Sequence, residues 1–159
     1  MKITILCVGK VKEAFYRDAI AEYAKRLARY VSLTVTEVAD EKAPERASES
    51  EEKHIVDTEG ERLLKYLDDD ASKIALCIDG KKTDSVGFAE KIEQVKLNGY
   101  GHIQFIIGGS LGLSGAVIGK SDFRLSFSDM TFPHQLMRVI LLEQIYRACR
   151  ISNNEPYHK

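Results

Sequence analysis

The sequence predicts an α/β fold in a single domain, residues 1–159, with a mainly parallel sheet and helices on both faces. Short apolar runs alternate along the chain with longer segments whose apolar residues recur at helical spacing. Most of the apolar runs end at a glycine or a polar turn. The order of elements, βαβαβαβαβα, is typical of parallel sheets. A chain of 159 residues can bury a core without disulfides or metals.

The N-terminal third predicts a strand, a helix and a second strand. Residues 3–8 form a short apolar run that Gly9 closes, as a buried strand would. Residues 13–30 place apolar side chains at helical spacing with charges between them. Residues 31–38 are rich in β-branched side chains, which favour a strand.

The middle of the chain predicts a charged helix and then a buried strand. The segment up to residue 67 is highly charged with a thin apolar stripe, and Pro44 is expected in the first turn of this solvated helix. Residues 74–78 predict a third strand that ends at Asp79-Gly80. The same patterns predict the remaining elements: a helix over 85–97 capped by Asp84 or Ser85, a strand over 103–107, a short helix over 114–119, a strand over 123–127 and a helix over 133–150.

The loops after Ile78, Ile107 and Phe127 are the expected ligand site, because ligands of open parallel sheets bind beyond the carboxyl ends of the strands. The loop 108–112, Gly-Gly-Ser-Leu-Gly, follows a buried strand directly. It has neither the Walker A lysine nor the glycine spacing of a dinucleotide fingerprint. A tight turn and a cofactor loop both explain it.

The segment 127–134, which joins the last strand to the last helix, also has two readings. Thr131 is suited to cap the helix and Pro133 to occupy its first turn. Alternatively, the backbone groups of this segment hydrogen-bond the edge of an adenine.

The last helix is apolar almost all round, so it needs cover on more than one side. We expect a second copy of the chain to supply that cover in a homodimer; the alternative is a helix sunk in its own core. Glu143 and Arg147 are four residues apart and predict a helical ion pair. The polar tail after it ends in Tyr157-His158-Lys159, which is either frayed or an acid/base pair with a phosphate contact.

Composition narrows the function classes. The net charge is −1, so any nucleic-acid contact must come from a local basic cluster. No apolar run approaches the roughly 20 residues of a membrane span, and the N-terminus lacks the pattern of a signal peptide, so we expect a cytoplasmic protein. The three cysteines lack zinc-ligand spacing and are expected as reduced, buried core thiols. His54, His102 and His134 are expected to have no partners and to be structural or surface residues.

Several segments in one order carry a resemblance to a known family. They are KITILCVGK, LCIDGK, IIGGSLGLS, LSFSDMTFPHQLMRVILLEQIYRA and NNEPYHK, and they span nearly the whole chain. Together they resemble the RlmH family of the SPOUT superfamily, whose members methylate a pseudouridine of large-subunit ribosomal RNA. Many relatives have Pro and an acidic residue where this loop has Ser110-Leu111, so the resemblance implies no role for a carboxylate there.

The resemblance implies a C-terminal trefoil knot, a homodimer and S-adenosyl-L-methionine as methyl donor, with no metal. The donor would be held by residues of three strand ends: Leu76, Gly108, Phe127, Ser128, Asp129, Met130, Thr131 and Phe132. His158 is the first candidate to remove the proton from the target nitrogen and Tyr157 the second, and Arg147 would orient the base or stabilise its charge. The substrate implied is the N3 of a pseudouridine in 23S rRNA on the assembled ribosome.

Two other functions fit the same patterns. A relative that methylates tRNA would have the same strand ends and the same glycine loop. A non-enzymatic ribosome-associated module that binds a nucleotide would need only the parallel sheet. A phosphate-binding enzyme is disfavoured because the glycine loop lacks a lysine.

Overall fold

The structure, a computed structural model, describes all 159 residues and contains one five-stranded sheet. The strands are β1 (Lys2–Val8), β2 (Ser32–Val38), β3 (Ser72–Lys82), β4 (His102–Ile107) and β5 (Phe123–Ser126). They lie in the order β2-β1-β4-β3-β5, and every pair is parallel. The helices are α1 (Ala14–Leu27), α2 (Glu49–Leu64), α3 (Ser85–Leu97), α4 (Gly115–Gly119) and α5 (His134–Ser152). The predicted fold class and the predicted order of elements are confirmed.

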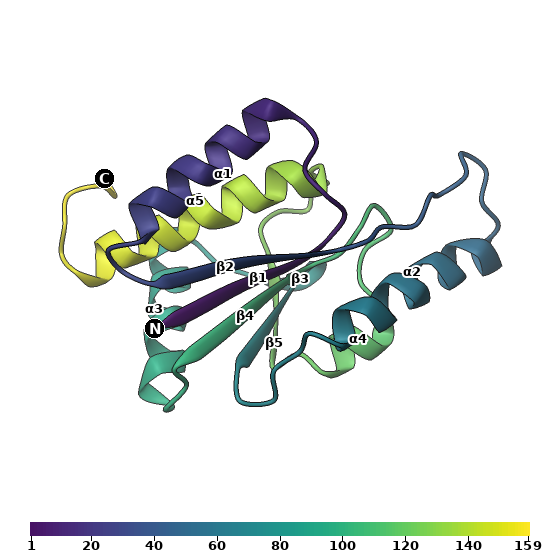
Figure 1. Ribbon diagram of the computed structural model, residues 1–159. Helices are drawn as coiled ribbons and strands as arrows, with labels where there is room; N and C mark the ends of the chain where they lie inside the picture. The colour runs from purple at the N-terminus through teal and green to yellow at the C-terminus, as the bar shows by residue number, and fades with distance from the viewer.

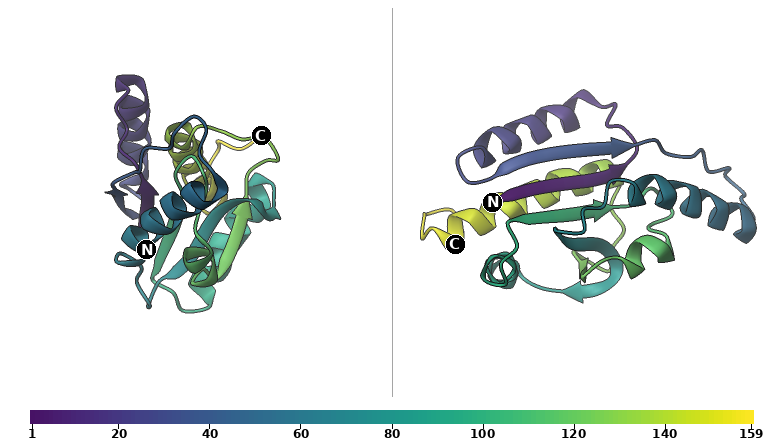
Figure 2. Two further views of the ribbon diagram at one scale, coloured as in Figure 1. Left: turned by 90° about the vertical axis from the view of Figure 1, so that its right-hand side faces the viewer. Right: turned by 60° about the horizontal axis from the view of Figure 1, so that its bottom comes forward.

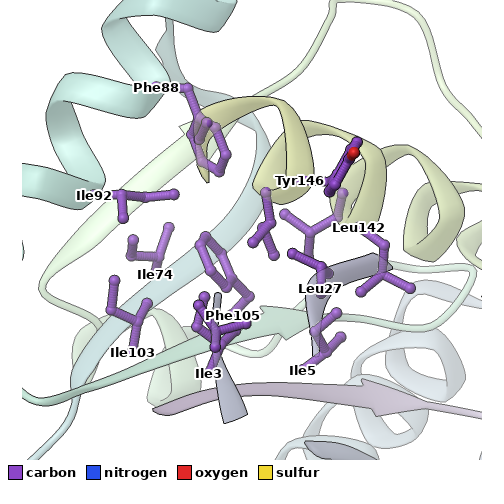
Figure 3. Packing of buried hydrophobic residues seen from close by; sticks show 14 of the residues in the cluster. Ile3, Ile5, Leu27, Ile74, Phe88, Ile92, Ile103, Phe105, Leu142 and Tyr146 are labelled. Atoms are coloured by element: carbon purple, nitrogen blue, oxygen red, sulfur yellow. The ribbon is translucent and has the colours of Figure 1, made fainter. Parts of the chain in front are cut away.

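Helices cover both faces of the sheet, as predicted. On one face α5 lies between α1 and α3, and on the other α2 lies beside α4 (Figure 1; Figure 2). Alternate residues of β1 point to the two faces: Ile3 and Ile5 belong to the larger apolar cluster, and Leu6 to the smaller one under α2 and α4. Figure 3 shows the larger cluster, in which Phe88 of α3 and Phe105 of β4 pack with ring centroids 6.0 Å apart.

Capping residues explain where two of the helices begin. Asp84 caps α3 by accepting a hydrogen bond from the Gly87 backbone N–H at 2.7 Å, one of the two predicted caps. The prediction of Pro44 in the first turn of α2 is wrong. Ser48 begins that helix through a reciprocal capping box with Glu51. The Ser48 hydroxyl accepts a hydrogen bond from the Glu51 backbone N–H, and the Glu51 carboxylate accepts one from the Ser48 backbone N–H.

Strand β3 does not end at Asp79-Gly80, as the sequence predicted, but continues to Lys82. The pairing register with β5 slips between Leu76 and Lys81, so residues 77–80 bulge out of the sheet and the strand then resumes. Gly80 permits the return, because a Cβ there would lie 2.6 Å from the backbone carbon of Leu125.

A hydrogen-bonded polar cluster lies near the amino ends of the strands. It shows that the expectation of no partner for His102 is wrong. His102 Nε2 lies 2.9 Å from Thr4 Oγ1, and its Nδ1 lies 3.0 Å from an Asp68 carboxylate oxygen. Beside it, Gln104 donates to the Tyr66 carbonyl and accepts from the Asp68 backbone N–H. Buried polar groups are stable when they are paired in this way.

The three cysteines are free, but only Cys7 is fully buried. Cys77 and Cys149 are half-buried, so the prediction of buried core thiols is wrong for these two. Burial raises the pKa of the Cys7 thiol to about 11 and that of Cys149 to about 11. None of the five helices combines the length and the apolar character that crossing a membrane requires.

Candidate functional site

A cavity of about 690 Å³ lies at the carboxyl end of the sheet, where the predicted site was expected. Its wall comes from the β3 bulge, the glycine loop after β4, α4, β5, the segment after β5 and the first turn of α5. The lining residues are 76–79, 107–113, 118, 125, 127, 128, 130–135 and 137. A volume of this size is typical of a pocket for a small-molecule cofactor.

The glycine loop is both a tight turn and part of the cavity wall, so the two readings of its sequence coexist. Gly109 and Gly112 pair across the turn, and Gly112 has φ +87°, a conformation that favours glycine. Gly108 packs against this turn so closely that a Cβ would lie 2.4 Å from the Gly112 carbonyl oxygen. The loop therefore presents backbone rather than side chains to the cavity at these positions.

The segment between β5 and α5 places most of the predicted cofactor-binding residues on the wall. Phe127, Ser128, Met130, Thr131 and Phe132 all line the cavity, as do Leu76 and Gly108. A short turn shapes the segment, in which the Ser128 hydroxyl accepts a hydrogen bond from the Met130 backbone N–H at 3.0 Å.

Asp129 differs from its neighbours, because its side chain is 79% exposed and pairs with Lys82 outside the cavity wall. Thr131 does not cap α5, contrary to one reading of the sequence. The residue at the start of that helix is Pro133, and no side chain caps it.

The β3 bulge adds Cys77 and Ile78, which the sequence placed inside a buried strand, and Asp79, which begins the loop expected at the site. Asp79 is the only acidic residue of the wall, and its carboxylate lies 3.4 Å from the Arg124 guanidinium. The signal that could have identified them is Gly80, which is the residue that allows the strand to bulge and resume.

The first turns of α5 contribute His134 to the wall and a buried arginine behind it. Burial, followed by the nearby Arg138 charge, lowers the pKa of His134. Arg138 is 1% exposed; it donates to the Val8 and Gly9 carbonyls at 2.8 and 2.6 Å and pairs with Glu37 at 2.6 Å. It thereby ties the start of α5 to the ends of β1 and β2. The sequence suggested only an arginine on an apolar helix.

The three predicted catalytic residues lie together at the other end of α5. Arg147 and Glu143 form the predicted ion pair at 2.6 Å. The Tyr157 hydroxyl donates to the same Glu143 oxygen at 3.0 Å, and the Arg147 guanidinium lies over the Tyr157 ring. His158 Nδ1 lies 3.4 Å from Arg147 Nη1. The tail is therefore held in place rather than frayed, also through an edge-on contact of Tyr157 with Tyr146.

Tyr157 is a proton donor in this arrangement. Burial and the hydrogen bond to Glu143 raise the pKa of Tyr157 to about 12, so the phenol keeps its proton at neutral pH.

The cavity and the tail cluster lie at opposite ends of α5. Arg147 follows His134 by 13 residues of continuous helix, which spans about 20 Å at 1.5 Å per residue. Figure 1 shows both chain termini at the end of the sheet opposite to α4 and the loops near it. One chain therefore does not bring its own Arg147, Tyr157 and His158 to its own cavity.

Helix α5 keeps apolar side chains that the chain itself covers only in part. Leu141, Leu142 and Ile145 are buried in the larger core cluster, so part of the helix is sunk in its own core. Val139 and Ile140 are only half-buried. These two side chains are suited to contact a second molecule.

The residues of the cavity fit S-adenosyl-L-methionine. Leu76, Ile107 and Phe127 offer apolar surface to an adenine ring, and the glycine loop offers backbone N–H and C=O groups. The Asp79 carboxylate is a suitable neighbour for a positively charged ligand. No group of three or more His, Cys, Asp or Glu side chains comes together as metal ligands would.

Comparison with known proteins gives a family match over nearly the whole chain. Residues 1–158 match the family described as "Predicted SPOUT methyltransferase". The chain is 61% identical to "Ribosomal RNA large subunit methyltransferase H" of Bifidobacterium adolescentis, and 57% identical to the protein of that name from Bifidobacterium animalis subsp. lactis. Both alignments cover 100% of each chain.

A solved structure supports the fold. It is described as a probable methylase family protein from Haemophilus influenzae and superposes with a TM-score of 0.54 at 16% identity. The superposition covers 99% of this chain and 70% of that one. At this identity the likeness concerns the fold alone.

Proposed function

Because this chain belongs to the SPOUT methyltransferase family, we propose that it methylates ribosomal RNA with S-adenosyl-L-methionine as the methyl donor. The target we propose is the N3 of a pseudouridine in 23S rRNA, presented by the assembled ribosome in the cytoplasm. Family membership also implies a C-terminal trefoil knot, an exception to the near-absence of knots in proteins.

One observation carries the proposal: the glycine loop and the segment after β5 meet around a single cavity at the carboxyl end of the sheet. Seven of the eight residues assigned to donor binding by resemblance line that cavity, and Asp129 is the exception. Two segments that follow different strands thus enclose a space suited to a nucleoside.

One group of residues would hold the donor, and a second group would accept the proton of the target nitrogen and stabilise the charge on the base. When bound, S-adenosyl-L-methionine supplies an electrophilic methyl group on a positively charged sulfur. Gly108 and the segment 127–132 would hold it so that the methyl group faces the incoming base. The target nitrogen is a poor nucleophile until its proton leaves, and we assign the acceptance of that proton to His158. Arg147 would stabilise the negative charge that develops on the base.

A homodimer would bring these two groups of residues together. Since about 20 Å of α5 separates the tail cluster from the cavity of the same chain, the tail of the partner subunit is the one that we place at each cavity. The half-buried Val139 and Ile140 support an interface on this helix.

Methylation assays on defined RNA test the substrate. Purified ribosomes, isolated 23S rRNA and bulk tRNA would each be incubated with the protein and labelled donor. Mass spectrometry of the digested RNA would then locate the methyl group. We expect an N3-methylated pseudouridine in 23S rRNA from ribosomes. Methylation of tRNA instead would identify the alternative enzyme, and absence of donor binding by calorimetry would favour the non-enzymatic nucleotide-binding module.

A mixing experiment tests the shared site. Gly108→Val would disable the cavity, and a chain without residues 157–159 would lack the tail, so each homodimer is expected to be inactive. In an equal mixture, about half of the dimers are heterodimers, and each has one site with an intact cavity and an intact tail from the other chain. About a quarter of all sites should therefore be active. An inactive mixture of well-folded, exchanging subunits would mean that each tail serves its own cavity.

A further inference from the structure

A buried carboxyl group contacts the glycine loop from outside the cavity wall, and the proposed reaction does not use it. Glu59 belongs to α2 and is only 4% exposed, although the sequence of this helix predicts a solvated, charged surface. Burying a carboxyl group is costly unless its oxygens are hydrogen-bonded. The charge pattern of α2 therefore does not explain why the Glu59 side chain is buried.

The two oxygens of Glu59 have different surroundings. Oε1 accepts a hydrogen bond from the Glu41 backbone N–H at 3.0 Å, which connects α2 to the segment after β2. Oε2 is buried and has no hydrogen-bond partner. Burial raises the pKa of this carboxyl group, and the nearby Asp40 charge raises it further, against the lowering effect of the Glu41 hydrogen bond.

The unpartnered oxygen packs against the backbone of Gly109. A Cβ at Gly109 would lie 2.7 Å from Glu59 Oε2 and 3.1 Å from Oε1. A side chain at this position would have to displace the Glu59 carboxyl group, so Gly109 permits close approach and does not adopt an unusual φ. The Glu59 carboxyl group thus fills the space directly beside a loop that lines the cavity.

The next residue of α2 makes a second contact just beyond the loop. A Cβ at Gly60 would lie 2.2 Å from the Ser114 hydroxyl oxygen. Ser114 is buried and caps α4, the helix that begins where the loop ends. Two consecutive residues of α2 therefore meet both the loop and the helix that follows it.

From these contacts we infer that Glu59 is a positioning residue for the methyl donor: its carboxyl group sets the position of Gly109 and so the shape of the donor cavity. Glu59 does not touch the cavity itself and acts through the loop. The inference rests on the proposed function, because it assigns the cavity to the donor. The inferred role depends on the shape of the carboxyl group and on the hydrogen bond that it accepts from the Glu41 backbone N–H. A side chain of the same shape that accepts this hydrogen bond should therefore position Gly109 equally well.

Calorimetry with S-adenosyl-L-methionine tests this directly. Glu59→Ala leaves a void beside Gly109 and should weaken donor binding by about tenfold, since small displacements of positioning groups are costly. The kcat at saturating donor should change by less than about threefold, so the effect appears in KM. Glu59→Gln keeps the shape and the acceptor oxygen and should bind the donor as the wild type does. Equal affinity of the alanine variant and the wild type, or equal damage from both substitutions, would overturn the inference.

A double-mutant cycle tests the contact with the loop. Gly109→Ala alone should weaken donor binding strongly, because its methyl group meets the Glu59 carboxylate. In the Glu59→Ala background the same methyl group has the vacated space, so the combined loss should be smaller than the sum of the two losses. Additive losses would overturn the inference.

Two control variants separate positioning from general effects on α2. Glu61→Ala changes an exposed carboxylate of the same helix and should leave donor binding unchanged. Leu63→Val trims buried packing of α2 in the smaller core cluster but keeps the Glu59 side chain, so it should lower the melting temperature and leave donor affinity unchanged. If the wild type itself binds no donor, the proposed function fails; if it binds and the Glu59 variants bind equally well, only this inference fails.

Discussion

The two ends of the sheet handle polar groups in opposite ways. Towards the amino ends of the strands, Thr4, His102 and Asp68 form a connected set of hydrogen bonds. At the carboxyl ends the chain instead leaves a cavity of about 690 Å³, a bulged strand and a loop made of glycines. The first arrangement is suited to stability and the second to binding a ligand.

Helix α5 connects the two ends and separates the residues assigned to donor binding from those assigned to proton transfer. Its first turn lines the cavity with His134, and its last turns hold Arg147 beside the tail. Parallel strands place all ligand-binding loops at one end, so a helix that returns antiparallel to them ends at the other. Under the proposed function, the residues assigned to donor binding and those assigned to proton acceptance therefore meet only if a second chain supplies the tail.

The largest effect is expected from a side chain at Gly108. Its Cβ would lie 2.4 Å from the Gly112 carbonyl oxygen, and backbone cannot move aside cheaply. Gly108→Val should therefore reduce donor affinity by more than about 100-fold in calorimetry. Gly115→Ala is the matched control, since a Cβ there meets nothing within 4 Å. Near-normal affinity of a folded Gly108→Val protein would refute the assignment of the carboxyl end to the donor.

Removal of the tail should separate the functions of the two ends. A chain lacking residues 157–159 loses Tyr157 and His158 but keeps every residue of the cavity wall. Donor affinity should stay within about twofold of wild type, while methylation falls by about 100-fold or more. Asn153→Ala, a change of an exposed residue just before the tail, serves as the control. A truncated enzyme with full activity would exclude a catalytic role for the tail.

A charge at the half-buried Ile140 of α5 should disrupt the homodimer that we propose. Ile140 is half-buried in the single chain, so Ile140→Arg would place a guanidinium in an apolar interface. Light scattering should show a monomer that binds the donor but does not methylate RNA. Leu97→Arg is the matched control, because Leu97 is an apolar residue 86% exposed on α3. A stable and active Ile140→Arg dimer would place the interface elsewhere.

Local sequence signals predicted the elements well where one residue decides the outcome. Asp84 is followed by an apolar helical pattern, and it caps α3 as expected. The apolar run before Gly108 predicted β4, and the loop after it lines the cavity. Two other local signals were misleading: Pro44 misplaced the start of α2, and Asp79-Gly80 misplaced the end of β3. In both cases a contact with a distant segment or a reciprocal hydrogen bond, rather than a proline or a turn dipeptide, sets the boundary.

Buried charged side chains are what the sequence could not predict. Glu59 sits in a run of charges that is exposed on either side of it, and Arg138 interrupts an otherwise apolar helix. Their burial depends on which glycine or carbonyl the fold brings against them, and these partners are 50 to about 130 residues away. The pattern of one segment contains no trace of such a partner.

The smallest effect that we predict concerns the amino-terminal end alone. Hydrogen bonds from the Asp70 backbone N–H and then from His102 lower the pKa of Asp68 below its ordinary value of 3.8. A carboxyl group with a lowered pKa in the folded state stabilises the fold above its unfolded pKa, and that stability is lost as the pH falls through the folded pKa. Asp68→Asn should therefore lower the urea midpoint at pH 5 to 7, and the gap to wild type should close as the pH falls below about 4. Donor affinity at pH 7 should not change, and the exposed neighbour Asp69 provides the control substitution Asp69→Asn. A gap that persists at pH 2.5 would show that Asp68 stabilises the fold by something other than its charge, and a loss of donor affinity would show that the two ends of the sheet are coupled.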